Sequence, residues 1–237
     1  MENPHIVTAF ENDLRNLKRR IVEMGGLVER AVADSIQALA RRDAELAKAL
    51  IAADARVDAM QREVEEAAIL VIAKRSPVAT DLREVVATLR IANDLERVGD
   101  MAKNIGKRVL AINGASPSPK LVLGVENLSR LALEQLVTVL DGYATGDVEK
   151  ANTVRANDGS IDALYTAIFR ELLTYMMEDP RNITSCTHLL FTAKNLERIG
   201  DHATNIAETI VYIATGEAPR DDRPKQDETT TMARTAP

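Results

Sequence analysis

The spacing of apolar residues divides most of the chain into long amphipathic helices. Apolar side chains in the first stretch recur every three or four positions, which places them on one face of an α-helix. They are Leu14, Leu17, Ile21, Met24, Val28, Val32 and Leu39. We therefore expect a first helix over residues 8–41. A second is expected over 43–74, capped by Asp43 and ended by Ser76-Pro77.

The same pattern of helix and stop signal continues to Gly216. A third helix is expected from near Thr80 to Asn113-Gly114, and a fourth covers the apolar positions between Leu121 and Tyr143. The fifth and sixth are expected over 147–177 and 182–214, and the signals that bound them are Gly146-Asp147, Asp179-Pro180 and Gly216. No segment has the period of two that is typical of a strand. The prediction is an all-α fold.

The helices group into two similar halves. Residues 5–114 form a first three-helix bundle of long antiparallel helices, and residues 120–216 form a second. Each half is long enough to bury a core of its own. Residues 115–119, which are rich in Pro and Ser, are expected to be a linker. Residues 217–237 are polar, lack an apolar period and are expected to be a disordered tail.

A segment of the third predicted helix recurs in the sixth. Leu89 to Ile105 matches Leu190 to Ile206 at 10 of 17 positions. The identities concentrate in the hexapeptide Leu-Glu-Arg-Val/Ile-Gly-Asp, which begins at Leu95 and at Leu196. A repeat kept only for packing is expected to share its apolar positions and to vary at its charged ones. The shared polar residues therefore indicate a duplicated site.

Each half contains two acidic pairs with a spacing of four residues. The pairs are Asp54 and Asp58, Glu96 and Asp100, Asp158 and Asp162, and Glu197 and Asp201. In each half the pairs lie on neighbouring antiparallel helices at the edge of the apolar face, so we expect them to face a groove. Like charges at this spacing destabilise a helix by about 0.2–0.5 kcal/mol, so the pairs need counter-charge.

Basic side chains can supply that counter-charge in the first half only. The candidates are Arg62, four residues after Asp58, and Lys103 and Lys107, three and seven residues after Asp100. The corresponding residues of the second half are Thr166, Thr204 and Glu208. We therefore expect that local salt bridges do not account for both copies.

Two interpretations of the acids remain open from the residues alone. Oxygen ligands from Asp, Glu and Asn suit Mg²⁺, Mn²⁺, Ca²⁺ or iron, and the alternative is a solvated acidic face. Gly99 and Gly200 lie inside helices, where glycine costs about 1 kcal/mol relative to alanine, so a helix or a metal cluster is expected to approach them closely. His202 has Met101 as its counterpart, so a function shared by both copies cannot depend on it.

Composition excludes several classes of function. A net charge of -6 and 3% aromatic residues argue against a nucleic-acid binder. The single cysteine, Cys186, excludes a disulfide framework and a thiolate zinc site, and it fits a reducing cytoplasm. The longest apolar run, Ala67 to Ala73, is too short to cross a bilayer. No catalytic nucleophile motif is found.

Several motifs together resemble the PhoU family of bacterial phosphate-signalling regulators. They are the two Leu-Glu-Arg-Val/Ile-Gly-Asp repeats, Met24-Gly25-Gly26, Ala73-Lys74-Arg75 and Tyr175-Met176-Met177-Glu178-Asp179. The resemblance covers residues 5–216 and implies a duplicated pair of three-helix bundles, a homodimer and no catalytic activity.

The resemblance also implies metal sites and partners. Divalent or ferric ions of Mg, Mn, Fe or Zn would bind Asp54, Asp58, Glu96 and Asp100 in one half and the equivalent acids in the other, namely Asp158, Asp162, Glu197 and Asp201. Side chains placed to orient these carboxylates are Arg97, Asn104, Arg198 and Asn205. At the second site, Lys194 and Asn195 replace Asn93 and Asp94.

Proteins of this kind link the high-affinity phosphate ABC transporter, through its ATPase subunit, to the phosphate sensor histidine kinase. They restrain phosphate uptake and keep the phosphate-starvation genes off. We therefore expect a cytoplasmic protein, peripheral to the inner membrane through its partners and without a nucleic-acid ligand.

Two other functions compete with this expectation. A ferritin-like di-iron carboxylate protein needs Glu-x-x-His on core helices, and the chain has this spacing only between Glu2 and His5, across Pro4. The second alternative is a plain helical scaffold whose acids are solvated.

Overall fold

The computed structural model describes residues 4–112 and 119–217, and its regular elements there are all helical. They are α1 (Pro4–Arg41), α2 (Ala44–Arg75), α3 (Ala79–Ile112), α4 (Pro119–Thr145), α5 (Val148–Glu178), the 3-10 turn η1 (Pro180–Asn182) and α6 (Ile183–Thr215). The predicted all-α class is confirmed, and α1 begins four residues before its predicted start at 8. Most of the predicted linker 115–119 and tail 217–237 lies outside the described residues. Pro119 opens α4, a position that suits proline because the first helical N–H has no partner within the helix.

Capping side chains start the second helix of each half as predicted. The Asp43 carboxylate accepts hydrogen bonds from the backbone N–H groups of Glu45 and Leu46, at 3.0 and 2.9 Å. The equivalent Asp147 accepts from the two corresponding N–H groups of α5, at 3.0 and 3.3 Å. These bonds satisfy N–H groups that the helix itself leaves free. At the other end of the chain, Gly216 ends α6 with φ 74° and donates its N–H to the carbonyl of Tyr212, at 2.9 Å.

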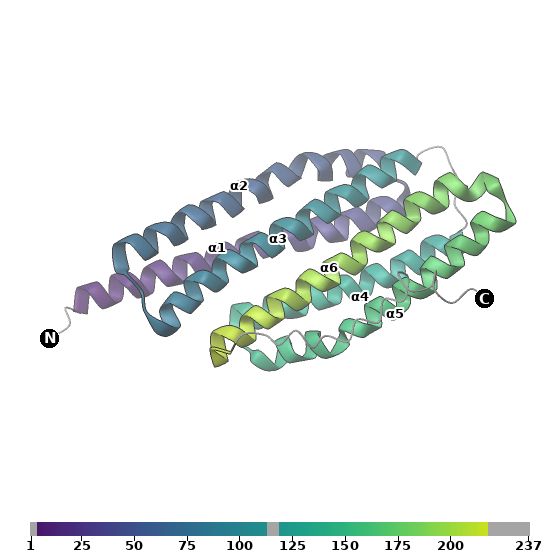
Figure 1. The fold of residues 1–237 in the computed structure, drawn as a ribbon. Coiled ribbons are helices and arrows are strands. Elements are labelled where there is room, and N and C mark those ends of the chain that lie inside the picture. The colour runs from purple at the N-terminus through teal and green to yellow at the C-terminus, as the bar shows by residue number, and fades with distance from the viewer. Residues whose placement is uncertain (1–3, 113–118, 218–237) are drawn as a thin grey trace.

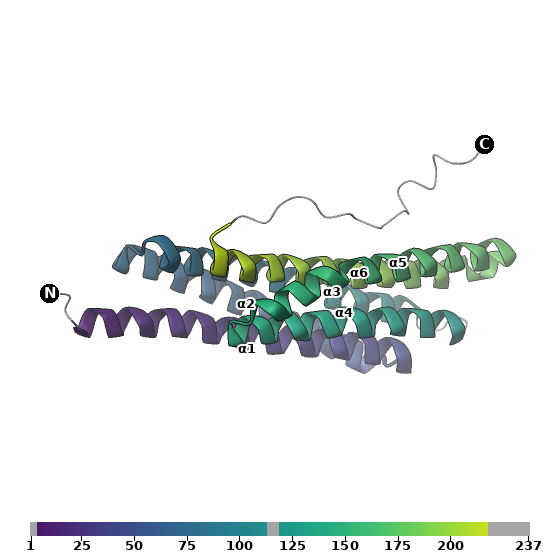
Figure 2. The same cartoon turned by 90° about the horizontal axis from the view of Figure 1, so that it is seen from below.

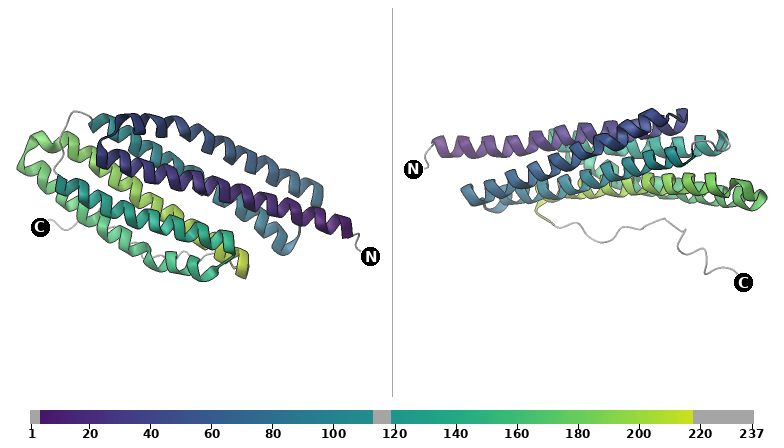
Figure 3. Two further views of the ribbon diagram at one scale, coloured as in Figure 1. Left: turned by 180° about the vertical axis from the view of Figure 1, so that it is seen from behind. Right: turned by 90° about the horizontal axis from the view of Figure 1, so that it is seen from above.

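The two halves are arranged as an elongated antiparallel pair. Helices α2, α3, α6 and α5 pack against one another in that order, and α1 and α4 contact each other along one side of α3 and α6 (Figures 1 and 2). The α2–α3 and α5–α6 turns lie at opposite ends of the molecule, and the view from behind shows the same relationship (Figure 3). One half is therefore related to the other by an approximate half-turn about an axis between α3 and α6.

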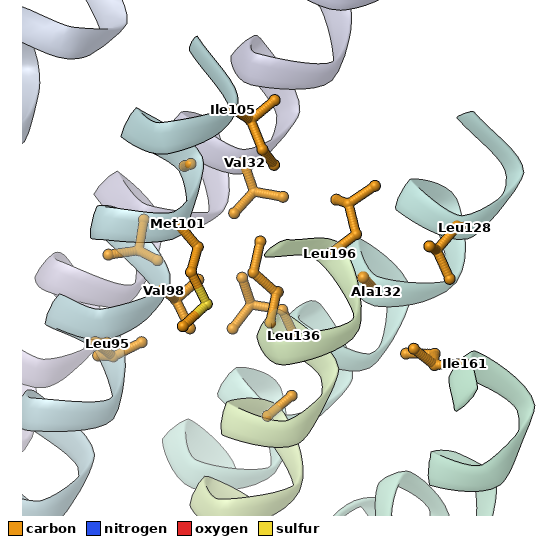
Figure 4. Packing of buried hydrophobic residues seen from close by; sticks show 14 of the residues in the cluster. Val32, Leu95, Val98, Met101, Ile105, Leu128, Ala132, Leu136, Ile161 and Leu196 are labelled. Carbon is orange, nitrogen blue, oxygen red and sulfur yellow. The ribbon is translucent and has the colours of Figure 1, made fainter. Parts of the chain in front are cut away.

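The two halves share one core. The main cluster of buried apolar side chains includes residues of all six helices and is continuous across the α1–α4 and α3–α6 contacts. Figure 4 shows Val98, Leu136, Ile161 and Leu196 among the side chains that fill the space between helices of both halves. The halves are thus not separately packed units. None of the helices in the described ranges is long and apolar enough to cross a membrane.

Candidate functional site

The first acid centre lies between α2 and α3 and contains an internal cation. Lys103 on α3 donates to Asp54 on α2, at 2.5 Å from Nζ to Oδ2, and to Asp100 one turn earlier on its own helix, at 2.6 Å from Nζ to Oδ1. Both hydrogen bonds raise the pKa of the Lys103 ammonium above its usual range, and the bond to Asp100 has the larger effect. The lysine therefore remains charged and neutralises the pair it joins.

The other acids of the first half lie in the same electrostatic field. Burial raises the pKa of Glu96, and the charges of Asp100, Asp58 and Asp54 raise it further, whereas Arg97 lowers it. All four acids that the sequence assigned to this site are thus close enough to influence one carboxyl group. The structure brings them together as expected.

The second acid centre lies between α5 and α6 and has a different hydrogen-bonding pattern. Thr204, the counterpart of Lys103, donates from Oγ1 to Oδ1 of Asp158, at 2.8 Å. Lys194 donates from Nζ to Oε1 of Glu197, at 2.8 Å. Burial raises the pKa of Glu197, and Asp201 and Asp162 add to this increase, whereas Lys194 opposes it. Glu197, Asp162 and Asp201 are therefore close together, and Asp158 is joined to α6 through Thr204.

One carboxylate oxygen of this second centre is left without a partner. Oε2 of Glu197 is buried and has no hydrogen-bond donor in the described structure, although the whole residue is only 4% exposed. A buried carboxylate oxygen without a donor costs about 1–3 kcal/mol or more, since the group has lost its water. The second centre thus has an unmet demand for positive charge or a donor.

The acids are not part of an open, solvated surface. Asp54, Asp162 and Glu197 are 8%, 6% and 4% exposed, and the other five carboxylate residues are partly buried. Grouping like charges where water is restricted is unfavourable unless a cation compensates them. This burial argues against the solvated acidic face that the sequence left open.

The comparison of counterpart positions overlooked one ion pair of the second half. The second half has its own ion pair, Lys194 with Glu197, formed from the turn before the glutamate rather than from the turn after the aspartate. The spacing of three residues between them is visible in the sequence, so this pair was predictable. The reach of Lys103 across to Asp54 was not predictable, because it depends on how α2 and α3 are aligned.

The helix glycines permit close contact between neighbouring helices of one half. A Cβ atom at Gly200 would lie 2.7 Å from Cδ1 of Ile161 on α5, and one at Gly99 would lie 3.2 Å from Cγ1 of Val57 on α2. The expected close approach is confirmed, and the groups that approach are apolar side chains. These contacts set the narrow spacing of α2 against α3 and of α5 against α6.

The four residues expected to orient the carboxylates differ in the contacts that they make. Arg97 lies 3.6 Å from Glu96 Oε2, measured from Nε. Arg198 is exposed, and neither it nor Asn104 forms a side-chain hydrogen bond or ion pair within the described ranges. Asn205 donates to Oδ1 of Asp94 on α3, at 3.3 Å. Asn205 therefore contacts an acid of the other half.

Sequence reasoning missed the polar contact that joins the two halves. Nδ1 of His202 on α6 lies 2.8 Å from Oδ1 of Asp94 on α3, and both side chains are largely buried. The only signal in the sequence was the lack of symmetry, because the counterparts Met101 and Asn195 are uncharged. His202 thus lies at the seam between the halves, where it contacts an acid of α3.

The duplication is also found when the chain is compared with known families. A family model described as the PhoU domain matches residues 21–109 and again residues 125–210. The two matches cover more than half of the chain, and each contains one acid centre. The chain belongs to the PhoU family.

Relatives and solved structures within the PhoU family match nearly the whole chain. The phosphate-specific transport system accessory protein PhoU homolog of Rhizobium meliloti (strain 1021) is 58% identical over 232 residues, which are 98% of this chain and 98% of the relative. A homolog of the same name from Caulobacter vibrioides (strain NA1000 / CB15N) is 52% identical over 94% of this chain and 97% of its own length.

Crystal structures of two PhoU proteins have the same fold. PhoU from Pseudomonas aeruginosa superposes with a TM-score of 0.85 at 35% identity, covering 88% of this chain and 100% of that one. The phosphate transport system regulatory protein PhoU from Streptococcus pneumoniae gives 0.83 at 29% identity, covering 89% and 99%. The expected PhoU-like pair of three-helix bundles is confirmed.

The metal ions that the resemblance to PhoU implies fit the second centre better than the first. Carboxylate oxygens suit hard cations, and the unpartnered Oε2 of Glu197 lies in a group with Asp162 and Asp201. In the first centre the ammonium of Lys103 already compensates Asp54 and Asp100. Within residues 4–112 and 119–217, no three His, Cys, Asp or Glu side chains converge closely enough to hold an ion as they stand. A bound cation thus requires side-chain rearrangement in both PhoU centres.

Proposed function

We propose that this protein regulates the phosphate transport system as a negative regulator of phosphate-starvation signalling and phosphate uptake. The supporting observation is its similarity over nearly the full chain to proteins named phosphate-specific transport system accessory proteins, at 58% and 52% identity. The relative from Streptococcus pneumoniae, described as a phosphate transport system regulatory protein, adds to this support.

In this proposal the protein is a non-catalytic adaptor. Its helical surfaces contact the ATPase subunit of the high-affinity phosphate ABC transporter and the phosphate sensor histidine kinase. When phosphate is plentiful, the adaptor holds the kinase in the state that keeps the starvation genes off, and it restrains the transporter. It is cytoplasmic, reaches the inner membrane through these partners and acts as a homodimer. The α2–α3 and α5–α6 turns lie at opposite ends of the molecule, which would allow two partners to bind apart from each other (Figure 1).

The acid centres have a structural role in this proposal. Divalent or ferric cations of Mg, Mn, Fe or Zn would be held by Glu197, Asp162, Asp158 and Asp201, and more weakly by the equivalent acids of the first half. Such a cation supplies positive charge that joins α5 to α6. The protein's part is to present carboxylate oxygens and to keep the neighbouring helices close through Gly200.

A deletion strain tests the regulatory role. Deleting the gene is expected to derepress alkaline phosphatase in high-phosphate medium, and supplying the wild-type gene in trans restores repression. Repression that stays intact in the deletion strain, while phosphate uptake through the transporter is shown to work, would contradict the proposal. A strain that carries an empty vector controls for effects of the plasmid.

Affinity capture from cells grown at two phosphate levels tests the adaptor role. Tagged protein is expected to retain the transporter ATPase subunit and the sensor kinase, both identified by mass spectrometry. A helical protein of similar size with the same tag is the matched control. Recovery of neither partner at either phosphate level would contradict the adaptor mechanism while leaving the deletion result to decide the regulatory role.

Metal content and mass can be measured on the purified protein. Elemental analysis after purification without chelator, and melting curves with added Mn²⁺, Mg²⁺, Fe or Zn²⁺, are expected to show bound metal and a higher Tm. Absence of metal together with an unchanged Tm would contradict the metal role alone. Sedimentation equilibrium is expected to give twice the chain mass of 25.9 kDa, and a monomer at all concentrations would contradict the homodimer.

A further inference from the structure

A cavity of about 230 Å³ lies at one end of the seam between the two halves, away from both acid centres. Its walls come from α1 and α3 of the first half and from the α4–α5 turn and the end of α6 in the second half. The apolar part of the lining includes Leu17 and Ile210, and the polar part consists mainly of Lys18, Glu84, Thr88 and Tyr143. The cavity is thus amphipathic and is shared by the two halves.

Two opposite charges face this cavity without neutralising each other directly. Neither Lys18 nor Glu84 forms an ion pair among the described residues, whereas the other cation in the lining, Arg15, is held by Glu11 at 3.1 Å. Burial and the charge of Asp81 raise the pKa of Glu84, and Lys18 acts in the opposite direction. The carboxylate is therefore partly desolvated and incompletely compensated.

A buried hydroxyl pair forms the polar floor between these charges. Tyr143 is 8% exposed, and its hydrogen bond with Thr88 opposes the increase that burial causes in its pKa. The Thr88 hydroxyl also donates to the backbone carbonyl of Glu84, at 2.9 Å. Lys18 Nζ lies 5.9 Å from the centre of the Tyr143 ring. Helices α1, α3 and α4 thus contribute to one small polar surface.

The equivalent junction at the other end of the molecule is built from different residues. The half-turn that relates the repeats replaces Tyr143 by Leu39, Thr88 by Leu189, Lys18 by Val122 and Glu84 by Ser185. Leu39 and Leu189 are both buried in the common core. Leucines are therefore sufficient to close this kind of junction, and packing alone does not explain the polar set at the first end.

We propose that this cavity binds a small zwitterion with an apolar side chain, of the class of the apolar α-amino acids. The ligand's carboxylate meets Lys18, its ammonium group meets Glu84, and its side chain lies against Leu17 and Ile210. A ligand with one charge would pair with only one of these two side chains, whereas a zwitterion pairs with both. The volume lies below the about 300–1,000 Å³ of sites for drug-sized molecules, which restricts the ligand to a small one.

Binding at this place would link the halves. Lys18 and Glu84 belong to the first half, and Tyr143 and Ile210 belong to the second, so a bound molecule contacts both. A ligand that binds only the folded, closed arrangement stabilises it in proportion to the logarithm of its concentration above Kd. The amino acid would therefore raise the Tm of the full-length protein.

Calorimetric titration of the full-length protein tests the proposal. L-leucine, L-isoleucine, L-methionine and L-phenylalanine are the probes, and hexanoate and hexylamine carry only one of the two charges. At least one amino acid is expected to bind one-to-one, at least about tenfold more tightly than either single-charge probe. Equal or tighter binding of hexanoate or hexylamine would overturn the zwitterion assignment. Absence of saturable binding of all probes up to about 10 mM would overturn the site.

Two variants introduce the residues of the equivalent junction at the other end of the molecule, and they test whether the amino acid binds in this cavity. Lys18→Val and Glu84→Ser each replace a partly or fully solvated side chain, so both are expected to fold, as circular dichroism will check. Each should weaken amino-acid binding at least about tenfold. Arg19→Val, next to Lys18 but outside the cavity lining, is the matched control and should bind like the wild type. Wild-type affinity in both cavity variants would overturn the proposal.

Discussion

Lys103 on α3 crosses to Asp54 on α2, with its Nζ 2.5 Å from Oδ2, and so places a cation of the protein itself inside the first acid centre. The second half has Thr204 at this position, where it donates to Asp158 at 2.8 Å. The duplication has therefore kept the carboxylates in both halves while changing the group that compensates them. The two centres are expected to differ in their need for an external cation.

Replacing the internal cation by its counterpart tests this difference. Lys103→Thr removes two charge-assisted hydrogen bonds from a site that is about one-fifth exposed, so without metal it is expected to cost about 2–3 kcal/mol. For a chain of this length, that cost lowers Tm by about 5–10 °C. Mn²⁺ or Mg²⁺ should then bind the first centre at least about tenfold more tightly than in the wild type, because no ammonium competes for the carboxylates.

The control for this change is Lys107→Thr, one turn further along α3 and exposed. It should alter neither the Tm nor the metal affinity beyond about 0.5 kcal/mol. Titration calorimetry and melting curves with and without metal provide both readouts. Equal metal affinities for Lys103→Thr and the wild type would show that the lysine does not occupy the place of a cation.

Glu197 of the second centre, whose Oε2 has no donor, predicts a dependence of stability on pH. Burial raises the pKa of Glu197 above 4.5, so the folded protein holds this proton more tightly than the unfolded chain does. The contribution of the group to stability is complete below pH 4.5 and is lost as pH rises through the folded-state pKa. Glu197→Gln is therefore expected to raise the Tm of the metal-free protein at pH 7, and this gain should disappear at pH 4.5.

Glu134→Gln, at an exposed position on α4, is the comparison for charge removal alone and should show no such pH-dependent gain. The measurement is differential scanning calorimetry of the three proteins in chelator across pH 4–8. With metal present the order should reverse, because the amide lacks the charge that a cation requires. A metal-free Glu197→Gln protein that melts below the wild type at pH 7 would contradict the assignment of an uncompensated carboxylate.

The helices could be predicted from the sequence because the signals that start, end and orient them are local. Asp43, Asp147 and Gly216 act on backbone groups within a few residues, and the apolar period marks the buried face wherever the helix packs. The placing of each acidic pair on one helix face was predictable in the same way, since a spacing of four residues fixes two side chains on one face. Such reasoning does not reach contacts whose partners are distant in sequence.

One contact in the first acid centre and one contact between the halves illustrate this limit. Lys103 and Asp54 are separated by 49 residues, and His202 and Asp94 by 108, so each depends on the alignment of two helices rather than on spacing. The apolar repeat of a helix is the same after a shift by one heptad, and it therefore does not determine which polar residues meet across an interface. The cavity lined by Lys18, Glu84 and Tyr143 is formed by helices of both halves, and the sequence does not reveal it for the same reason.

The polar contact between the halves predicts measurable coupling between two residues. His202→Met and Asp94→Asn each copy the counterpart in the other repeat, and each removes one side of the 2.8 Å contact. His202→Met leaves a buried carboxylate with only the 3.3 Å bond from Asn205, and it is expected to cost about 1–3 kcal/mol. Urea denaturation of both single variants and the double variant should give a coupling energy of about 0.5–3 kcal/mol. Additive single effects would show that the contact contributes nothing to the seam.

The tight approach at Gly200 predicts that two steric changes compensate each other. Gly200→Ala would gain up to about 1 kcal/mol of helix propensity, but its Cβ would lie 2.7 Å from Ile161 Cδ1, and such overpacking costs about 1–3 kcal/mol. Ile161→Val removes that methyl group and alone costs about 0.5–1.5 kcal/mol. The double variant should therefore lose less unfolding free energy than the two single variants together. Urea denaturation should show a difference of at least about 1 kcal/mol. Gly26→Ala, whose Cβ would meet nothing within 4 Å, is the control and should be stabilising, because it gains propensity without a clash. If Gly200→Ala is as stabilising as Gly26→Ala, the close approach of α5 to α6 does not require glycine.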